Sequence, residues 1–146
     1  MTEYLDALKK LHTVLIDSRN GYDEALRDTD GGGLTPLFRE MIALRDAHHH
    51  EIDAHLRDAG ESPDESGSFM TAVHRTIFKI RSLVTGLDDS VLPGLIDGEE
   101  RVLTYYDDVL RSAPSPAVAS TLNAQALALR EKIAHMRMME NDGGAA

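Results

Sequence analysis

The chain has 146 residues and a mass of 16.0 kDa, which is the size of one domain because domains average roughly 100–200 residues. It contains no cysteine, so disulfide frameworks, thiolate zinc sites, iron–sulfur clusters and cysteine nucleophiles are excluded. Its 25 acidic residues exceed its 15 basic residues and give a formal net charge of −10, which opposes binding to the phosphates of nucleic acids.

The first part of the chain has the composition and apolar spacing of two helices. Aromatic residues make up only 5%, and alanine, leucine and charged residues favour helix over strand. A first helix is expected over about residues 2–28, ended by Gly31–Gly33. A second is expected from an N-cap at Thr35, with Pro36 in its first turn, to Gly60. Their apolar stripes are Tyr4, Leu8, Leu11, Leu15, Tyr22 and Leu26 in the first, and Leu37, Phe38, Met41, Leu44, Ile52 and Leu56 in the second.

The rest of the chain predicts a loop and further helical segments. Residues 61–68 are rich in Ser, Pro, Asp and Gly and indicate a loop, and residues 69–86 form an amphipathic segment. The next helix has Pro93 in its first turn, and Ser115 is a candidate N-cap of the last one. Their apolar stripes are Leu92, Leu95, Val102, Leu103, Val109 and Leu110, then Val118, Leu122, Ala126, Leu129, Ile133 and Met136.

Four such helices bury their apolar stripes most simply against one another. The additional segment over residues 69–86 lies where a bundle with a long crossover needs chain to pass from one end to the other, as in ferritin-like proteins. We therefore expect an all-α, ferritin-like four-helix bundle with an additional helix in the crossover between the second and third bundle helices. It forms a single domain over residues 1–140, followed by a disordered tail at residues 141–146.

One acidic residue, Glu99, interrupts an apolar stripe within about 20° of its centre. Burying an unpaired carboxylate costs several kcal/mol, so we expect Glu99 to be paired, hydrogen-bonded, protonated or metal-bound. One hypothesis is a buried ion pair of Glu99 with Arg45 or Arg19, which lie near the stripes of their own helices. The polar residues expected to complete this network are Tyr22, Tyr106 and Gln125.

A second hypothesis makes Glu99 a metal ligand, or a general acid with a raised pKa. Four of the seven histidines lie within the eight residues 48–55. His48 and His55 are about 10.5 Å apart along the helix axis, too far for convenient chelation of one ion, whereas Glu51 and His55 have the favourable i, i+4 spacing. The candidate ligands of one divalent ion, iron or zinc, are His48, Glu51, His55 and Glu99.

Classical di-iron ferroxidase chemistry is not expected. A di-iron bundle uses a Glu from each of two helices and a Glu-x-x-His pair from each of the other two. Here the first helix shows no inward carboxylate, the second has Glu51-x-x-x-His55, and the last presents Gln125 inward. The chain also lacks a phosphate-binding loop, a serine nucleophile elbow and a His-Glu-x-x-His motif.

The order of several short motifs resembles an uncharacterised bacterial family, a domain of unknown function placed among ferritin-like four-helix-bundle proteins. The resemblance covers about residues 5–136; Ser18 stands where the family often has Gly, and a stretch with Phe78 replaces its usual Trp. It implies a ferritin-like fold, with Tyr22, Glu99 and Tyr106 at motif positions, and no established activity. The residues that carry it are Ile16, Asp17, Gly21, Tyr22, Ala25, Arg45 to Glu51, Gly60, Gly67, Ser68, His74, Arg75, Gly98, Glu99, Tyr106 and Leu110.

Three functions follow as hypotheses. The first is a non-catalytic structural or interaction module without a cofactor, which forms a homo-oligomer or binds a protein partner. The alternative is a divergent ferritin-like protein that holds one metal ion for redox or storage chemistry. The third is pH sensing by the histidines of residues 48–55, because imidazoles titrate near pH 6–7.

The sequence also indicates where the protein acts. No apolar run approaches the ~20 residues of a membrane-spanning helix. The first ten residues lack the basic start and apolar stretch of a signal peptide. We therefore expect a cytoplasmic protein that binds neither membranes nor nucleic acid.

Overall fold

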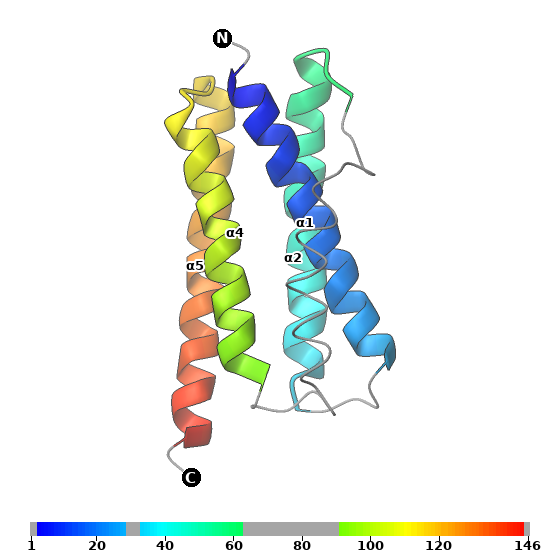
Figure 1. Cartoon of the computed structure of the whole chain (residues 1–146), viewed down its shortest axis with the longest axis vertical. Helices are drawn as coiled ribbons and strands as arrows, with labels where there is room; N and C mark the ends of the chain where they lie inside the picture. Colours follow the sequence, from blue (N-terminus) through cyan, green and yellow to red (C-terminus); the bar gives the residue numbers. More distant parts are fainter. Residues whose placement is uncertain (1–2, 29–32, 63–90, 145–146) are drawn as a thin grey trace.

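The computed structural model describes residues 3–28, 33–62 and 91–144. This part of the chain is all-helical, without a strand, and its four helices lie alongside one another (Figure 1). None of these helices is both long and apolar enough to cross a bilayer. The amphipathic segment expected over residues 69–86 lies outside the described residues. The helices are α1 (Glu3–Asp28), α2 (Thr35–Asp58), α4 (Leu92–Arg111) and α5 (Pro116–Gly144).

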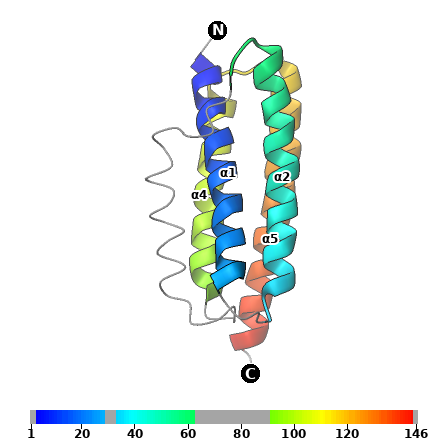
Figure 2. The same ribbon diagram turned by 90° about the vertical axis from the view of Figure 1, so that its right-hand side faces the viewer.

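The four helices form two antiparallel pairs. α1 packs on α2 and α4 on α5, and the pairs meet through α1 against α4 and α2 against α5 (Figures 1 and 2). The order around the bundle is therefore α1, α2, α5, α4, which leaves α2 and α4 on a diagonal. α2 ends and α4 begins at opposite ends of the bundle, so these diagonal helices run in the same direction (Figure 1).

The helix ends follow the sequence signals in part. Leu34, and not the expected Thr35, is the N-cap of α2, and it makes no side-chain capping bond. Burial explains this position, because Leu34 is 1% exposed and belongs to the core. Its carbonyl oxygen accepts the first hydrogen bond of the helix, from the Phe38 amide at 3.0 Å. The expected cap of α5 is confirmed, since Ser115 Oγ accepts the Val118 amide at 3.3 Å. α5 runs to Gly144, beyond the boundary expected at residue 140.

Gly60 ends α2 for a conformational reason. Its φ of +79° lies in the left-handed region, whereas Gly33 has no positive φ. A Cβ added at either glycine meets no atom within 4 Å, so packing does not distinguish them. Replacing Gly60 with alanine is therefore expected to lower the free energy of unfolding by about 1–2 kcal/mol. The matched Gly33→Ala variant should lose nothing in the same urea titration, and equal losses would contradict this explanation.

The apolar stripes meet in one core. All six inward residues expected of α5 are buried, as are most of those expected of the other helices. α1 differs because its five consecutive residues Leu11–Leu15 are all buried. A single apolar stripe therefore underestimates how much of α1 is buried, and polar residues outside the stripe can be buried as well.

Candidate functional site: a buried ion pair between diagonal helices

Glu99 projects from α4 into the interior, where its carboxylate is 3% exposed. Arg45 of α2 is fully buried, and its Nη2 donates a hydrogen bond to Glu99 Oε1. The Tyr22 hydroxyl of α1 donates to Glu99 Oε2. Each carboxylate oxygen thus has a donor, and the negative charge of Glu99 lies against the positive charge of Arg45. The pair joins the diagonal helices α2 and α4, and Tyr22 adds α1.

The surroundings of Arg45 are only partly polar. Its Nε donates to Ser18 Oγ at 3.2 Å, and its Nη1 has no hydrogen-bond partner among the described residues. Burial lowers the pKa of the Arg45 guanidinium, and the Tyr22 and Tyr106 hydroxyls oppose this shift. The energetic balance of this group depends on Glu99, because a buried guanidinium is costly without a paired anion.

The tyrosine hydroxyls act as donors at neutral pH. Burial raises the pKa of Tyr22 to about 12, although the charge of Arg45 acts in the opposite direction. Burial also raises the pKa of Tyr106 well above its usual value, again against Arg45. Both hydroxyls therefore keep their protons, and neither supplies a phenolate for chemistry near pH 7.

A second set of hydrogen bonds joins α4, α5 and α2. The Tyr106 hydroxyl donates to Gln125 Oε1 at 2.8 Å. Gln125 Nε2 lies 3.1 Å from both the His48 carbonyl oxygen and Glu51 Oε1. The five residues expected to form one network therefore lie in two sets in the described part of the chain: Tyr22, Arg45 and Glu99 in the first, Tyr106 and Gln125 in the second.

Three of the four residues expected as metal ligands bind other groups. Glu51 accepts from Gln125, His55 Nε2 lies 2.8 Å from Thr121 Oγ1, and Glu99 is bound to Arg45 and Tyr22. Within the described ranges, no three His, Asp or Glu side chains gather closely enough to hold an ion.

His48 is 6% exposed, and its Nδ1 has no hydrogen-bond partner among the described residues. Burial lowers the pKa of His48 to about 4; Arg45 adds to this shift and Glu51 opposes it. The ring is therefore neutral at pH 7.

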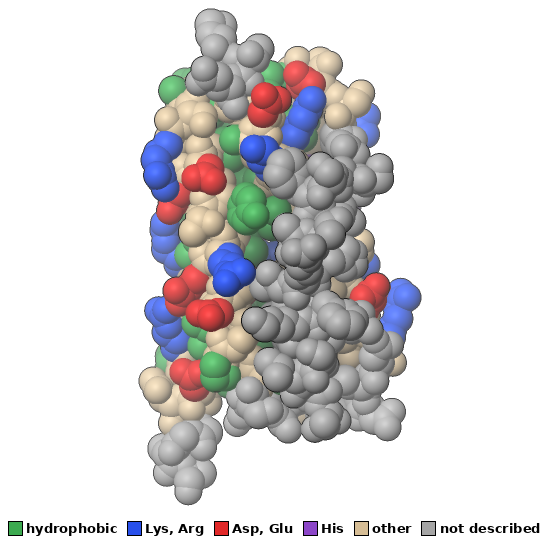
Figure 3. Space-filling view, in the orientation of Figure 1, with side chains coloured by type: hydrophobic (Ala, Val, Ile, Leu, Met, Phe, Trp, Pro, Cys, Tyr) green, Lys and Arg blue, Asp and Glu red, His purple; other side chains and the backbone are tan. Residues whose placement is uncertain are grey.

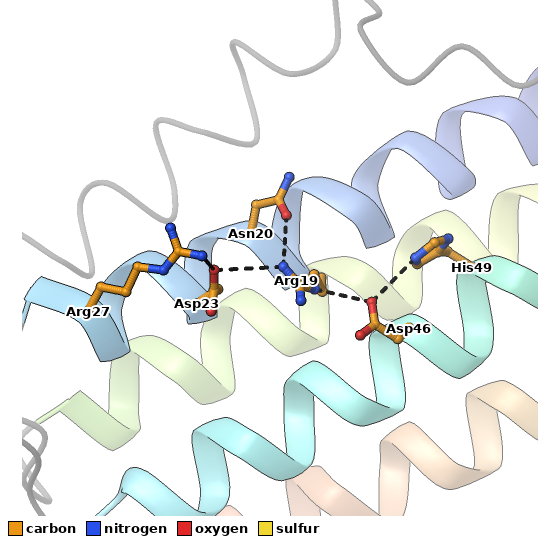
Figure 4. Close-up of polar contacts among 6 residues, drawn as sticks. All are labelled: Arg19, Asn20, Asp23, Arg27, Asp46 and His49. Carbon is orange, nitrogen blue, oxygen red and sulfur yellow. Dashed lines mark hydrogen bonds and ion pairs between the residues drawn. The ribbon is translucent and has the colours of Figure 1, made fainter.

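Arg19, the other expected partner of Glu99, lies instead on the surface between α1 and α2. Its Nε is 3.1 Å from Asp46 Oδ1 and its Nη1 is 3.7 Å from Asp23 Oδ2. Arg27 and His49 extend this row at its two ends, at 2.7 Å from Asp23 and 3.4 Å from Asp46 (Figure 4). Such partly exposed pairs contribute at most about 1 kcal/mol each.

The sequence pattern missed buried polar residues of α1. Asp17 is 1% exposed, so the expectation that this helix has no inward carboxylate is wrong. His12 is also 1% exposed, and its ring meets that of His49 edge-on, with centroids 5.6 Å apart. The apolar period of α1 predicts neither as buried, because it marks one stripe of the helix and α1 is enclosed on more than one side. A signal was present, since Asp17 belongs to one of the motifs that carry the family resemblance.

Comparison with known proteins identifies a family. The sequence model of a family described as a domain of unknown function (DUF2383) matches residues 3–112. The match spans α1, α2 and α4, and α5 lies outside it. No curated protein and no solved structure matches the chain.

Proposed function

Since this chain belongs to the DUF2383 family, a domain of unknown function, we propose a function from the geometry of its interior. The protein is a non-catalytic structural or interaction module that associates with itself or with another protein. The Arg45–Glu99 pair fixes the packing of the diagonal helices α2 and α4, and α5 packs against both of them.

One observation supports this proposal most: both oxygens of the Glu99 carboxylate already accept a hydrogen bond from the protein. Arg45 and Tyr22 each bind one of its oxygens, in an interior where Glu99 is 3% exposed. A metal ligand or general acid needs a free lone pair or an exchangeable proton directed at its target. A buried ion pair, by contrast, favours the packing in which its partners meet and penalises packings that separate them.

The proposal includes a ferritin-like topology. The parallel course of α2 and α4 requires a connection along the whole bundle (Figure 1), which is the crossover of ferritin-like folds. The additional helix that the sequence predicts over residues 69–86 is proposed as part of that crossover, and it lies outside the described residues. We further propose that the protein is bacterial, that it acts in the cytoplasm without a cofactor, and that it binds neither membranes nor nucleic acid. Its charge of −10 opposes binding to nucleic-acid phosphates.

Metal analysis of untagged protein tests the proposal against its alternative, a single iron or zinc ion bound through Glu99. We expect sub-stoichiometric metal after purification and no rise in melting temperature when Fe²⁺ or Zn²⁺ is added. A site filled at 100 times its dissociation constant would stabilise the fold by about 2.7 kcal/mol. The Glu99→Gln and His48→Ala variants locate any metal that appears. Stoichiometric metal in the wild type that is lost in each of these two variants would overturn the proposal. Metal that is retained in each variant is bound at another place, and Glu99 then keeps its structural role.

A further inference from the structure

The outward side of α5 exposes large apolar side chains. Within residues 3–28, 33–62 and 91–144, Leu127 and Met138 are the large hydrophobic residues that stand exposed, at 57% and 63%. They are eleven positions apart on one helix, so they point within about 20° of the same direction and lie about 16 Å apart along the axis. Single exposed hydrophobic residues are common, so the case for a contact surface depends on the residues between and beside these two.

These residues belong to a longer row, which we call the outer stripe. Its positions are spaced alternately three and four residues apart, as in the contact seam of a coiled coil. All are exposed, and one of them, Glu131, is charged. The outer stripe consists of Ala117, Ser120, Ala124, Leu127, Glu131, Ala134, Met138 and Asn141.

The outward side of α4 has a different composition. Side chains of both signs are interspersed over it (Figure 3). The charged residues among its exposed positions are Asp97, Glu100, Arg101, Asp108 and Arg111. Interface cores are depleted in charged residues relative to the remaining surface, so the outer stripe, and not the exposed side of α4, has the composition of a contact surface.

Charge indicates what the outer stripe meets. The chain carries −10, and two copies therefore repel one another over most of their surfaces. α5 is the exception, because its three basic residues balance its three acidic ones: Arg130, Lys132 and Arg137 against Glu131, Glu140 and Asp142. Repulsion between two copies is weakest where these neutral helices face each other.

We infer that the outer stripe is the surface at which two copies of this chain associate, with their α5 helices antiparallel. Leu127 of each copy then packs on Met138 of the other. This register sets Glu131 opposite Ala134, whereas a parallel, in-register pairing would set Glu131 against Glu131. The same patch serves both copies about a two-fold axis. The inference rests on the proposed function as an interaction module and names the partner.

The association is expected to be reversible. One helix face buries less than the about 1,600 Å² of a standard interface, so we expect a dissociation constant in the micromolar range. Because both copies are acidic, screening of their repulsion should strengthen the dimer when NaCl is raised from low to high concentration. A basic partner held by charge would respond in the opposite direction.

Sedimentation equilibrium tests this surface. The wild type should pass from monomer to dimer as its concentration rises. The Leu127→Gln/Met138→Gln variant, which keeps the net charge, should dissociate at least tenfold more readily. The matched Ala43→Gln/Ala54→Gln variant, on exposed positions of α2, should behave as the wild type. Glu131→Ala should strengthen the dimer, and since every substituted residue is exposed, the circular dichroism of each variant should stay unchanged.

Three results would overturn the inference: a wild type that stays monomeric at high protein and salt concentration, a dimer that the α5 double variant leaves intact, or a dimer that the α2 control disrupts instead. These outcomes are separable from failure of the proposed function. A monomeric wild type without bound metal removes the inference and leaves binding to another protein. Metal bound through Glu99 contradicts the proposed function, whether the protein sediments as a monomer or as a dimer.

Discussion

Replacing Glu99 with alanine is expected to lower the free energy of unfolding by about 3–5 kcal/mol, because the fully buried Arg45 then keeps a charge without a counter-ion. The Tyr22 hydroxyl loses its acceptor in the same variant. Arg45→Met should cost a similar amount, since it leaves the carboxylate of Glu99 with Tyr22 as its donor. Urea titrations of the two single variants, followed by circular dichroism, measure both losses.

The double variant Arg45→Met/Glu99→Leu gives the stronger test. Replacing a buried ion pair by apolar side chains of similar size is often neutral or stabilising, whereas removing one partner is not. We therefore expect the double variant to be more stable than either single variant. Additive losses would contradict the view that the two charges compensate each other.

A matched control uses a surface pair. Arg19 is partly exposed and pairs with Asp46 and Asp23, so Arg19→Met should cost at most about 2 kcal/mol. This control separates loss of a buried charge partner from loss of an arginine. An equal cost for Arg19→Met and Arg45→Met would remove the special role of the interior pair.

The direction of most side chains around each helix could be predicted from the sequence, whereas the choice between candidate partners could not. The apolar period places Glu99 and Arg45 inward, and both are buried. It places Arg19 inward as well, although the structure has Arg19 on the surface with Asp46. Periodicity gives the direction of a side chain around its own helix axis. The choice of partner also depends on how far neighbouring helices are shifted along the bundle axis, and the spacing of residues on a single helix carries no information about that shift.

The sequence could not reveal contacts made by the backbone. Gln125 was expected to join the network around Glu99, and instead its amide spans the His48 carbonyl oxygen and Glu51. Every residue has a carbonyl, so no pattern of side-chain types marks the one that is used. Asp17 shows a related gap: its burial depends on α1 being enclosed on more than one side, which a single-stripe wheel does not represent.

His48 is expected to make the stability of the fold depend on pH below neutrality. Burial beside Arg45 lowers the pKa of its ring from 6.5 to about 4, whereas the unfolded chain titrates near the ordinary value of about 6.5. As pH falls from about 6.5 to about 4, the unfolded state therefore binds a proton that the folded state does not, and stability decreases. One proton changes the free energy of unfolding by at most about 1.4 kcal/mol per pH unit. The loss attributable to His48 thus reaches at most about 3.5 kcal/mol and is constant below pH 4.

His48→Gln isolates this effect, because glutamine does not titrate while the other acidic and basic groups remain. Urea titrations at several pH values between 7 and 4 should show the wild type losing stability more steeply than His48→Gln. The exposed His50, changed to glutamine in the same way, is the matched surface control. Parallel curves for the wild type and His48→Gln would contradict a buried neutral imidazole, and a shallower wild-type curve would show that the folded state binds the proton more tightly. The expected pH dependence has a structural origin, because His48 lies one helical turn from Arg45 on α2. Protonation of His48 would place a second positive charge there. Glu99, which is already bound to Arg45 and Tyr22, does not compensate this charge.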